Sequence, residues 1–328
     1  MGVTAVNDNV NEREVILGIE HLSKFFGKKQ VLRDISFNTY AGEVFGFLGP
    51  NGAGKTTLIK TVVGHLMIDD GSISICGKTL KNDFEGAMAK VGGIIENPEF
   101  YKYMSGYDNL LQYARLRGVE DETRVKEVVH LVGLDNRIHE KVGRYSLGMR
   151  QRLGVAQAIL HYPKLLVLDE PTNGLDPAGI KDLRDVLKRI AHEEGASVLV
   201  SSHLMSEMEL MCDRVGVIIG GELADVKPID ELVSATAMDK SDFIFETGDG
   251  SAVMALLDFI PDTGKTLLEN GDVELVIPKQ DERGLLARIN RTVVEAGIDL
   301  YSVSRKENKR LEDVFIEMTG GEGGVQID

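Results

Sequence analysis

One segment of nine residues constrains this chain more than any other feature. It reads Gly49-Pro-Asn-Gly-Ala-Gly-Lys-Thr-Thr57 and fits the pattern G-x-x-x-x-G-K-[ST]. Its glycines let the backbone curl tightly, so that successive N–H groups can point inward at an anion. A helix that begins at the end of such a loop adds its positive N-terminal end. The segment therefore predicts a cradle for phosphate groups between a strand and a helix.

The residues on either side of the loop fit this interpretation. The apolar run Val44–Leu48 enters it as a buried strand would, and Leu58–Val63 leaves it with helix-compatible residues. Lys55 would place its charge against the β- and γ-phosphates of a nucleotide, and Thr56 would offer a hydroxyl to Mg²⁺. We therefore expect ATP and Mg²⁺ as ligands. The loop residues expected to hold the nucleotide are Gly49, Asn51, Gly52, Ala53, Gly54, Lys55, Thr56 and Thr57.

A second run ends in two adjacent acids. Leu165–Leu168 is continuously apolar, as a buried parallel strand is, and Asp169 and Glu170 follow it. Functional residues gather at the carboxyl ends of such strands, so Asp169 could hold Mg²⁺ and Glu170 could orient or deprotonate an attacking water. Acids in this position are also commonly solvated or cap the next helix. The acid pair becomes a strong indication of a functional site only together with the predicted phosphate cradle.

Composition limits the other classes of function. The 328 residues carry a net charge of −15, which repels nucleic acid unless a local basic patch intervenes. Cys76 and Cys212 lie far apart and have no metal-ligand spacing, which favours two reduced thiols. Apolar runs stay well short of the ~18 residues of a membrane span. We expect a cytoplasmic chain that reaches any membrane through a partner.

Hydrophobic patterning indicates an α/β fold with a second, smaller domain. Short apolar runs alternate with helical patterns over 15–230, and a stretch of helical spacing at about 99–150 predicts a helical insert. Residues 238–319 show the order βαββαβ plus a closing helix at Leu311–Met318, which suits a small ferredoxin-like α+β domain. The polar segment 1–14 and the glycine-rich segment 320–328 are expected to be flexible tails.

The ordered motifs over roughly 15–230 resemble those of the ATP-binding-cassette (ABC) transporter ATPases. Tyr145-Ser-Leu-Gly-Met-Arg-Gln151 resembles the family signature, usually Leu-Ser-Gly-Gly-Gln, and Asn173-Gly-Leu-Asp176 resembles the D-loop. His203 stands where the family has its switch histidine, and Phe26 matches the aromatic residue that stacks on adenine. Taken singly, each has a simpler explanation: a structural histidine, a core phenylalanine and a helix cap at Ser146.

The resemblance implies a P-loop NTPase core of the RecA-like type and an ATPase that works as a head-to-tail pair. In that pair Ser146 and Gly148, with Asp176, would contact nucleotide held by the loop of a second copy. Glu170, His203 and Lys55 would be the catalytic residues. A serine hydroxyl and helix N-terminal N–H groups can stabilise the charge of a transferring phosphoryl group.

The chain departs from the family pattern at two positions. Leu147 replaces a glycine of the signature, and Glu96 stands where the family has the Q-loop glutamine. Glu96 would join Thr56 and Asp169 as a metal ligand, although it could also be a tolerated polar residue ahead of Pro98. Glutamate at this position with a Tyr-Ser-Leu-Gly-Met signature resembles bacterial exporters that protect against bacitracin or lantibiotic peptides.

The resemblance also implies partners. An exporter ATPase would bind an integral membrane permease at the inner face of the cell membrane. The segment Pro98–Tyr103 could form that contact, or its aromatics could equally pack beneath the insert. The alternatives are a non-transport ABC ATPase acting on soluble or nucleic-acid targets, and a nucleotide-binding module without turnover. About ninety residues separate Lys55 from Ser146, too few for the coiled coils of DNA-repair relatives. Glu170 and His203 argue for turnover.

Overall fold

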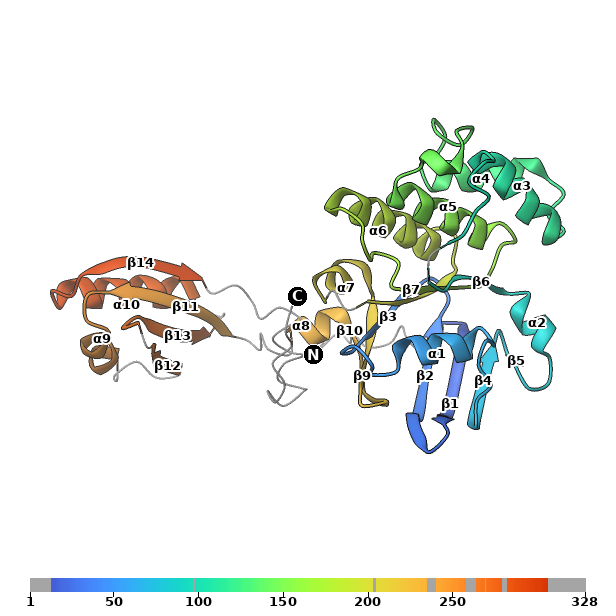
Figure 1. Cartoon of the computed structure of the whole chain (residues 1–328). Helices are drawn as coiled ribbons and strands as arrows, with labels where there is room; N and C mark the ends of the chain where they lie inside the picture. Colours follow the sequence, from blue (N-terminus) through green and yellow to red (C-terminus); the bar gives the residue numbers. More distant parts are fainter. Residues whose placement is uncertain are drawn as a thin grey trace, which may run out of the picture. The chain divides into compact units, whose positions relative to one another are not determined.

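A computed structural model describes residues 13–96, 98–202, 205–234, 240–257, 264–268, 270–278 and 282–305. The chain divides into two compact units, residues 1–229 and 230–328 (Figure 1). The predicted tails, apart from Arg13 and Glu14, and the predicted helix Leu311–Met318 lie outside the described residues.

The first unit is built on two sheets. One is antiparallel, in the order β2-β1-β4-β5, and the other has six strands in the order β10-β9-β3-β8-β7-β6. In the second sheet β6, β7, β8, β3 and β9 run parallel, and β10 pairs antiparallel with β9. The antiparallel strands are β1 (Val15–Phe26), β2 (Lys29–Tyr40), β4 (Asp70–Ile75) and β5 (Lys78–Thr79). The larger sheet comprises β3 (Val44–Leu48), β6 (Val91–Ile94), β7 (Leu165–Asp169), β8 (Ser197–Ser201), β9 (Arg214–Ile219) and β10 (Glu222–Pro228).

Burial follows from the apolar runs. Every residue of β3, β7 and β8 is buried, as expected for central strands of a parallel sheet covered on both faces. Helix α1 (Lys55–Val62) contacts β2 and β7, and α6 (Pro177–His192) and α7 (Met205–Met211) contact β3. Phe37 of β2 packs on Phe45 and Phe47 of β3, with ring centroids 5.3 and 5.0 Å away. This core holds the end of β3, and therefore the loop that follows it, in place.

The predicted helical insert lies between β6 and β7. Short α2 (Phe84–Met88) precedes β6, and the insert contains α3 (Gly106–Leu116), α4 (Glu122–Leu131), the 3₁₀ turn η1 (Val142–Arg144) and α5 (Leu147–Ile159). Ser105, Asp121 and Ser146 cap α3, α4 and α5 by accepting backbone N–H groups. The helical spacing seen in the sequence corresponds to the buried face, which includes Leu110, Ala114, Val125, Val128 and Val129. Leu116, which shares that spacing, is 81% exposed.

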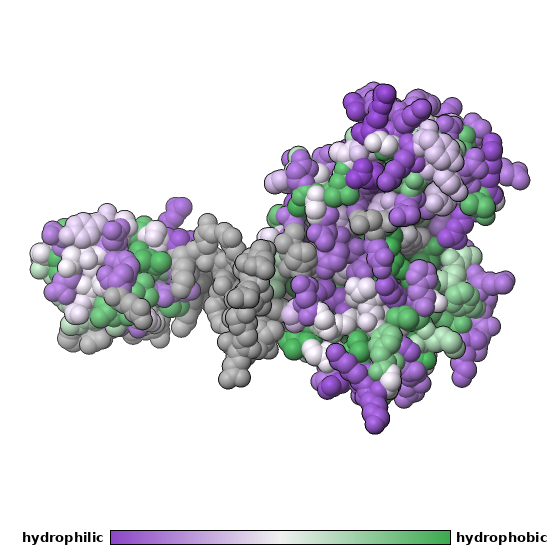
Figure 2. Space-filling model, in the orientation of Figure 1, coloured by the Kyte–Doolittle hydropathy of each residue, from purple (hydrophilic) through white to green (hydrophobic). Residues whose placement is uncertain are grey.

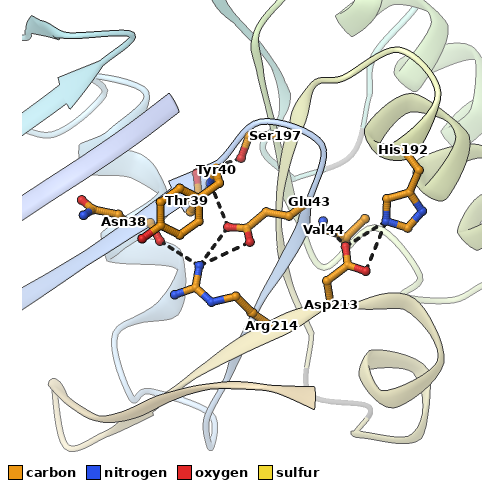
Figure 3. Close-up of polar contacts among 9 residues, drawn as sticks. All are labelled: Asn38, Thr39, Tyr40, Glu43, Val44, His192, Ser197, Asp213 and Arg214. Atoms are coloured by element: carbon orange, nitrogen blue, oxygen red, sulfur yellow. Dashed lines mark hydrogen bonds and ion pairs between the residues drawn. The ribbon is translucent and has the colours of Figure 1, made fainter. Parts of the chain in front are cut away.

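Polar contacts fix the opposite end of β3 (Figure 3). The buried carboxylate of Glu43 accepts hydrogen bonds from the Arg214 guanidinium at 3.1 and 3.3 Å and from the Tyr40 N–H at 2.8 Å. Asp213 accepts the N–H of Val44 at 2.7 Å and lies 2.9 Å from Nε2 of His192. Burial raises the pKa of Glu43, and the charge of Arg214 opposes that shift. These contacts join β2, β3, β9 and α6, so the strand that leads into the phosphate loop is anchored at its start.

The second unit confirms the predicted ferredoxin-like connectivity. Its antiparallel sheet has the order β12-β13-β11-β14, so the first and third strands of the βαββαβ unit are central. Alternate residues of β11 and β13, together with one face of α10, form its core, which includes Phe245, Val273, Leu275, Ile289 and Val293. The elements are β11 (Lys240–Thr247), α9 (Gly250–Leu256), β12 (Gly264–Leu267), β13 (Val273–Pro278), α10 (Glu282–Glu295) and β14 (Leu300–Arg305), after α8 (Ile229–Ser234).

The surface of the first unit is uneven in polarity. Figure 2 shows a mainly hydrophilic surface over the helical insert and apolar residues gathered over α1 and α2. A groove of about 690 Å³ in this region is lined by residues that include Leu66, Met67, Ile73 and Phe84. Among the described helices, none has the length and apolar character that crossing a lipid bilayer requires.

Candidate nucleotide site

The loop 49–57 has the backbone conformation that its glycines predict. Gly52 and Gly54 have φ values of +81° and +111°, in the left-handed region that other residues avoid. A Cβ at Gly49 would lie 2.5 Å from the carbonyl oxygen of Ile218, so only glycine fits where the loop leaves β3. Gly54 is the N-cap of α1, and within the described structure no side chain caps that helix. The first N–H groups of α1 are therefore positioned to bind an anion.

The side chain of Lys55 folds back across the start of the loop. Its side chain is buried, and Nζ donates hydrogen bonds to the carbonyl oxygens of Gly49 at 2.6 Å and Pro50 at 3.3 Å. Burial lowers the pKa of Lys55, while the carboxylates of Glu170 and Asp169 oppose that shift. The predicted loop lysine and the predicted acid pair thus act on each other electrostatically. Of the remaining loop residues, Ala53 is buried, Thr57 is half-buried, and Asn51, Gly52 and Thr56 are exposed.

A serine that the sequence analysis did not assign to the site connects the two acids. Ser201, at the end of β8, pairs in register with Asp169 at the end of β7. Its Oγ donates to Oδ1 of Asp169 at 2.6 Å and accepts the N–H of Glu170 at 3.0 Å. Asp169 is 8% exposed, so this bond satisfies a carboxylate that would otherwise be costly to bury. Ser201 therefore holds the carboxylate of Asp169 and the backbone of Glu170.

Glu170 has a conformation typical of functional positions. Its φ of +49° is uncommon for a residue other than glycine, and it follows directly after a buried strand. The turn is closed by the N–H of Asn173, which donates to the carbonyl oxygen of Glu170 at 3.1 Å. The predicted switch residue His203 lies outside the described residues, just after the buried Ser202.

Glu96 follows β6 and faces α1. Its Oε1 lies 3.0 Å from Nζ of Lys60, and its side chain is 72% exposed. Its φ of +70° again marks a constrained turn. Lys60 could not be identified from the sequence, because nothing in the local pattern shows which residue of α1 lies opposite the turn. The predicted contact of Glu96 with a metal stays a prediction.

Phe26 is not part of the core. It ends β1, and 49% of its surface is exposed. The ammonium of Lys24 lies 5.6 Å from its ring centroid and also pairs with Asp69 at 3.0 Å. The simpler interpretation of Phe26 as a core residue is therefore wrong. An aromatic ring exposed beside a cation is a suitable surface for stacking a planar base.

The predicted signature and D-loop residues are helix caps within their own chain. Exposed Ser146 caps α5 by accepting the N–H of Met149 at 3.2 Å, and Asp176 caps α6 by accepting the N–H of Gly179 at 3.1 Å. The capping role expected for an isolated Ser146 is thus present. It leaves the hydroxyl at the positive end of a helix, where an anion is favoured.

Comparisons with known proteins agree with this geometry. The family model described as "ABC transporter" matches residues 32–173. The uncharacterized ABC transporter ATP-binding protein YhcH of Bacillus subtilis (strain 168) is 45% identical over 309 residues, which are 94% of this chain and 97% of that protein. The bacitracin transport ATP-binding protein BcrA of Bacillus licheniformis is 35% identical over 306 residues, covering 93% of this chain and 98% of BcrA.

A solved structure gives the same result for the fold. The structure described as the ATP-binding subunit of an ABC transporter superposes with a TM-score of 0.61 at 28% identity, covering 68% of this chain and 94% of that chain. The match to BcrA, at 306 residues, is longer than the first unit, which ends at Ile229, so it continues into the second. The phosphate loop, the acid pair and these relatives together show that the chain belongs to the family of ABC transporter ATP-binding proteins and is the ATP-hydrolysing subunit of a transporter.

Proposed function

We propose that two copies of this chain bind two MgATP molecules head to tail and drive an exporter of antimicrobial peptides of the bacitracin type through a separate membrane permease. The observation that best supports the chemistry is the Ser201-bridged acid pair beside Lys55. It places an oriented carboxylate and a buried cation next to a helix N-terminus that no described side chain caps.

The residues present fit a magnesium ion beside the phosphates. Hydroxyl and carboxylate oxygens are ligands that Mg²⁺ prefers, and Thr56 and Asp169 supply them here. Ser201 takes one of about four lone-pair positions of Asp169, which leaves capacity for a water or metal contact. When bound, Mg²⁺ would offset phosphate charge. Glu96 is proposed as a further contact, for which its pair with Lys60 would have to open.

The chain's own residues would then act in sequence. The N–H groups of 52–57 and the ammonium of Lys55 hold the β- and γ-phosphates, and Phe26 stacks on the adenine. Glu170 accepts a proton from, or orients, the water that attacks the γ-phosphorus. Ser146 and Gly148 of the second copy stabilise the charge on the γ-phosphate oxygens, with Asp176 close by. His203 is proposed to contact the same phosphate.

The permease contact is proposed at the start of the helical insert. Tyr101 and Tyr103 are 54% and 70% exposed, with ring centroids 5.9 Å apart, and they follow Glu96 closely in the chain. Phe100, by contrast, packs edge-on against Tyr113 of α3. Phe100 therefore supports the helical insert, whereas Tyr101 and Tyr103 form an exposed pair that a permease can cover. This contact would hold the chain at the inner face of the cell membrane.

A complementation experiment tests the head-to-tail arrangement. Two differently tagged copies are purified together with the permease, one carrying Lys55→Ala and the other Ser146→Arg. If each site uses Lys55 of one copy and Ser146 of the other, this pair keeps one intact site and about half of the wild-type ATPase rate. A pair in which one copy carries both substitutions and the other none has no intact site. Equal rates in the two pairs would refute the arrangement.

The transported class is tested in cells. Deleting the gene for this chain together with that for its permease is expected to lower the inhibitory concentration of bacitracin by several-fold, because export would no longer reduce the peptide concentration at the membrane. Re-expression of the wild-type pair should restore resistance, and re-expression with Glu170→Gln should not. Unchanged sensitivity to bacitracin and to other cell-wall-active peptides would refute this substrate class while leaving the ATPase proposal intact.

A further inference from the structure

The leucine that replaces a signature glycine packs on the D-loop of its own chain. Gly174 has a φ of +73°, and a Cβ placed on it would lie 3.0 Å from Cδ2 of Leu147. In return, Cδ2 of Leu175 would lie 3.8 Å from a Cβ placed on Gly148, which is ordinary van der Waals separation. The start of α5 and the segment 173–176 therefore interdigitate: each leucine lies over a glycine of the other segment.

The segment that Leu147 contacts is also tied to the catalytic glutamate. The N–H of Asn173 donates to the carbonyl oxygen of Glu170 at 3.1 Å, and the N–H of Leu175 donates to that of Thr172 at 3.1 Å. Asp176 then caps α6. These bonds make 170–176 a series of short turns, in which a shift of Gly174 must be taken up at Glu170 or at the start of α6.

We propose that Leu147 is a positioning residue that couples Ser146 to Glu170 within one chain. Leu147 directly follows Ser146 and packs against Gly174, which belongs to the series of turns that begins at Glu170. When Ser146 contacts nucleotide in a second copy, the contact at Leu147 carries that movement to Glu170 in its own site. The inference rests on the proposed head-to-tail pair, because only then do Ser146 and Glu170 of one chain serve different nucleotides.

Leucine in place of the signature glycine at position 147 thus replaces a close approach of the backbone with a side-chain contact to Gly174. A glycine at 147 would leave Gly174 without this packing, and glycine is the residue with the greatest backbone freedom. Both leucines of the contact are half-buried, so the contact is apolar and partly shielded from water. A defined leucine contact can hold the turn in one position without touching substrate.

The test compares Leu147→Ala with Leu147→Met in the wild-type assembly of two chains and permease. Alanine keeps the helix but removes the atoms that reach Gly174, whereas methionine keeps an apolar chain of similar volume. We expect Leu147→Ala to lower kcat about tenfold, as misplacement of a catalytic group does, with little change in KM for MgATP. Leu147→Met should keep kcat within about twofold of wild type. Leu267→Ala, at an exposed leucine of β12, is the matched control and should change neither constant.

Three further measurements separate positioning from simple destabilisation. Nucleotide affinity of the single chain and its thermal midpoint should be unchanged in Leu147→Ala, since the loop 49–57 is untouched. In a double-mutant cycle, Leu147→Ala and Leu175→Ala should be non-additive in kcat, because they remove neighbouring contacts between the same two segments. Wild-type kcat in Leu147→Ala, or a parallel fall in affinity, midpoint and kcat, would overturn the inference. If Lys55→Ala and Ser146→Arg fail to complement, the proposed pair itself is wrong.

Discussion

Replacing Glu170 with glutamine is expected to stop steady-state ATP hydrolysis while leaving ATP binding intact. Glu170 is oriented by its N–H bond to Ser201 and by its φ of +49°, both of which an amide side chain preserves. Glutamine keeps the shape but cannot accept a proton from the attacking water. Loss of a general base typically lowers a rate by about 10²- to 10⁴-fold. We expect a fall of at least about 100-fold in kcat of the assembled transporter.

The same variant should accumulate the ATP-bound state. Because the proposed binding residues in the loop 49–57 are unchanged, MgATP should still bind. If the proposed pair forms, two copies should remain associated with nucleotide through size-exclusion chromatography. Glu193→Gln is the matched control: Glu193 is exposed and pairs with Arg189 on the surface at 3.8 Å. It should hydrolyse ATP at the wild-type rate. A Glu170→Gln rate above about one third of wild type would show that another group activates the water.

The phosphate loop could be predicted from the sequence because its geometry is set by residues that follow one another in the chain. The phosphate loop needs glycines, a lysine and a hydroxyl in a fixed order, and the structure gives Gly52 and Gly54 the backbone angles that this order requires. The same holds for the βαββαβ pattern of the second unit, whose period changes between strands and helices. Each of these features depends on residues that are close together in the chain.

Ser201 shows why the rest could not be predicted. Its contacts with Asp169 and Glu170 depend on β8 lying beside β7 with Ser201 opposite Asp169, which is a property of strand order and register. The pair of Glu96 and Lys60 likewise requires the position of β6 relative to α1. A polar residue that ends a fully buried strand is a usable signal, since it must be satisfied by neighbours at the same edge of the sheet.

Two further features were decided by tertiary packing. Leu116 belongs to the run of helical spacing in the insert yet lies 81% exposed, because it comes two positions, more than half a turn, after Ala114, the last buried residue of α3. In β1 the alternation of apolar residues is broken by register shifts near His21, whose φ is +51°. Such bulges obscure the period of two that identifies a strand, and the antiparallel β1–β2 pair was not predicted for that reason.

Replacing Lys55 with methionine is expected to remove both nucleotide binding and hydrolysis. The side chain is buried, so a neutral residue of similar length tests the charge without opening a cavity. In the wild type, the carboxylates of Glu170 and Asp169 act on the ammonium of Lys55. Without that ammonium, the γ-phosphate would face these two carboxylates with no cation at position 55 to offset their charge. Charge-assisted contacts to a buried phosphate are strong, and losing one should weaken MgATP binding about 100-fold or more.

The measurement is MgATP affinity of the single chain, followed by kcat of the assembly. Lys78→Met is the matched control, because Lys78 is also a lysine of the first unit but pairs with Asp83 at the surface, where its side chain is 44% exposed. Removing that charge should change affinity by less than about twofold, since exposed pairs contribute little.

Burial lowers the pKa of Lys55, whereas the charges of Glu170 and Asp169 raise it, and a bound polyphosphate adds negative charge beside it. Nucleotide should therefore favour the ammonium form, and binding near the pKa of Lys55 should take up protons. Wild-type affinity in Lys55→Met would show that the loop amides alone hold the phosphates, and wild-type proton uptake in that variant would show that another group takes up the proton.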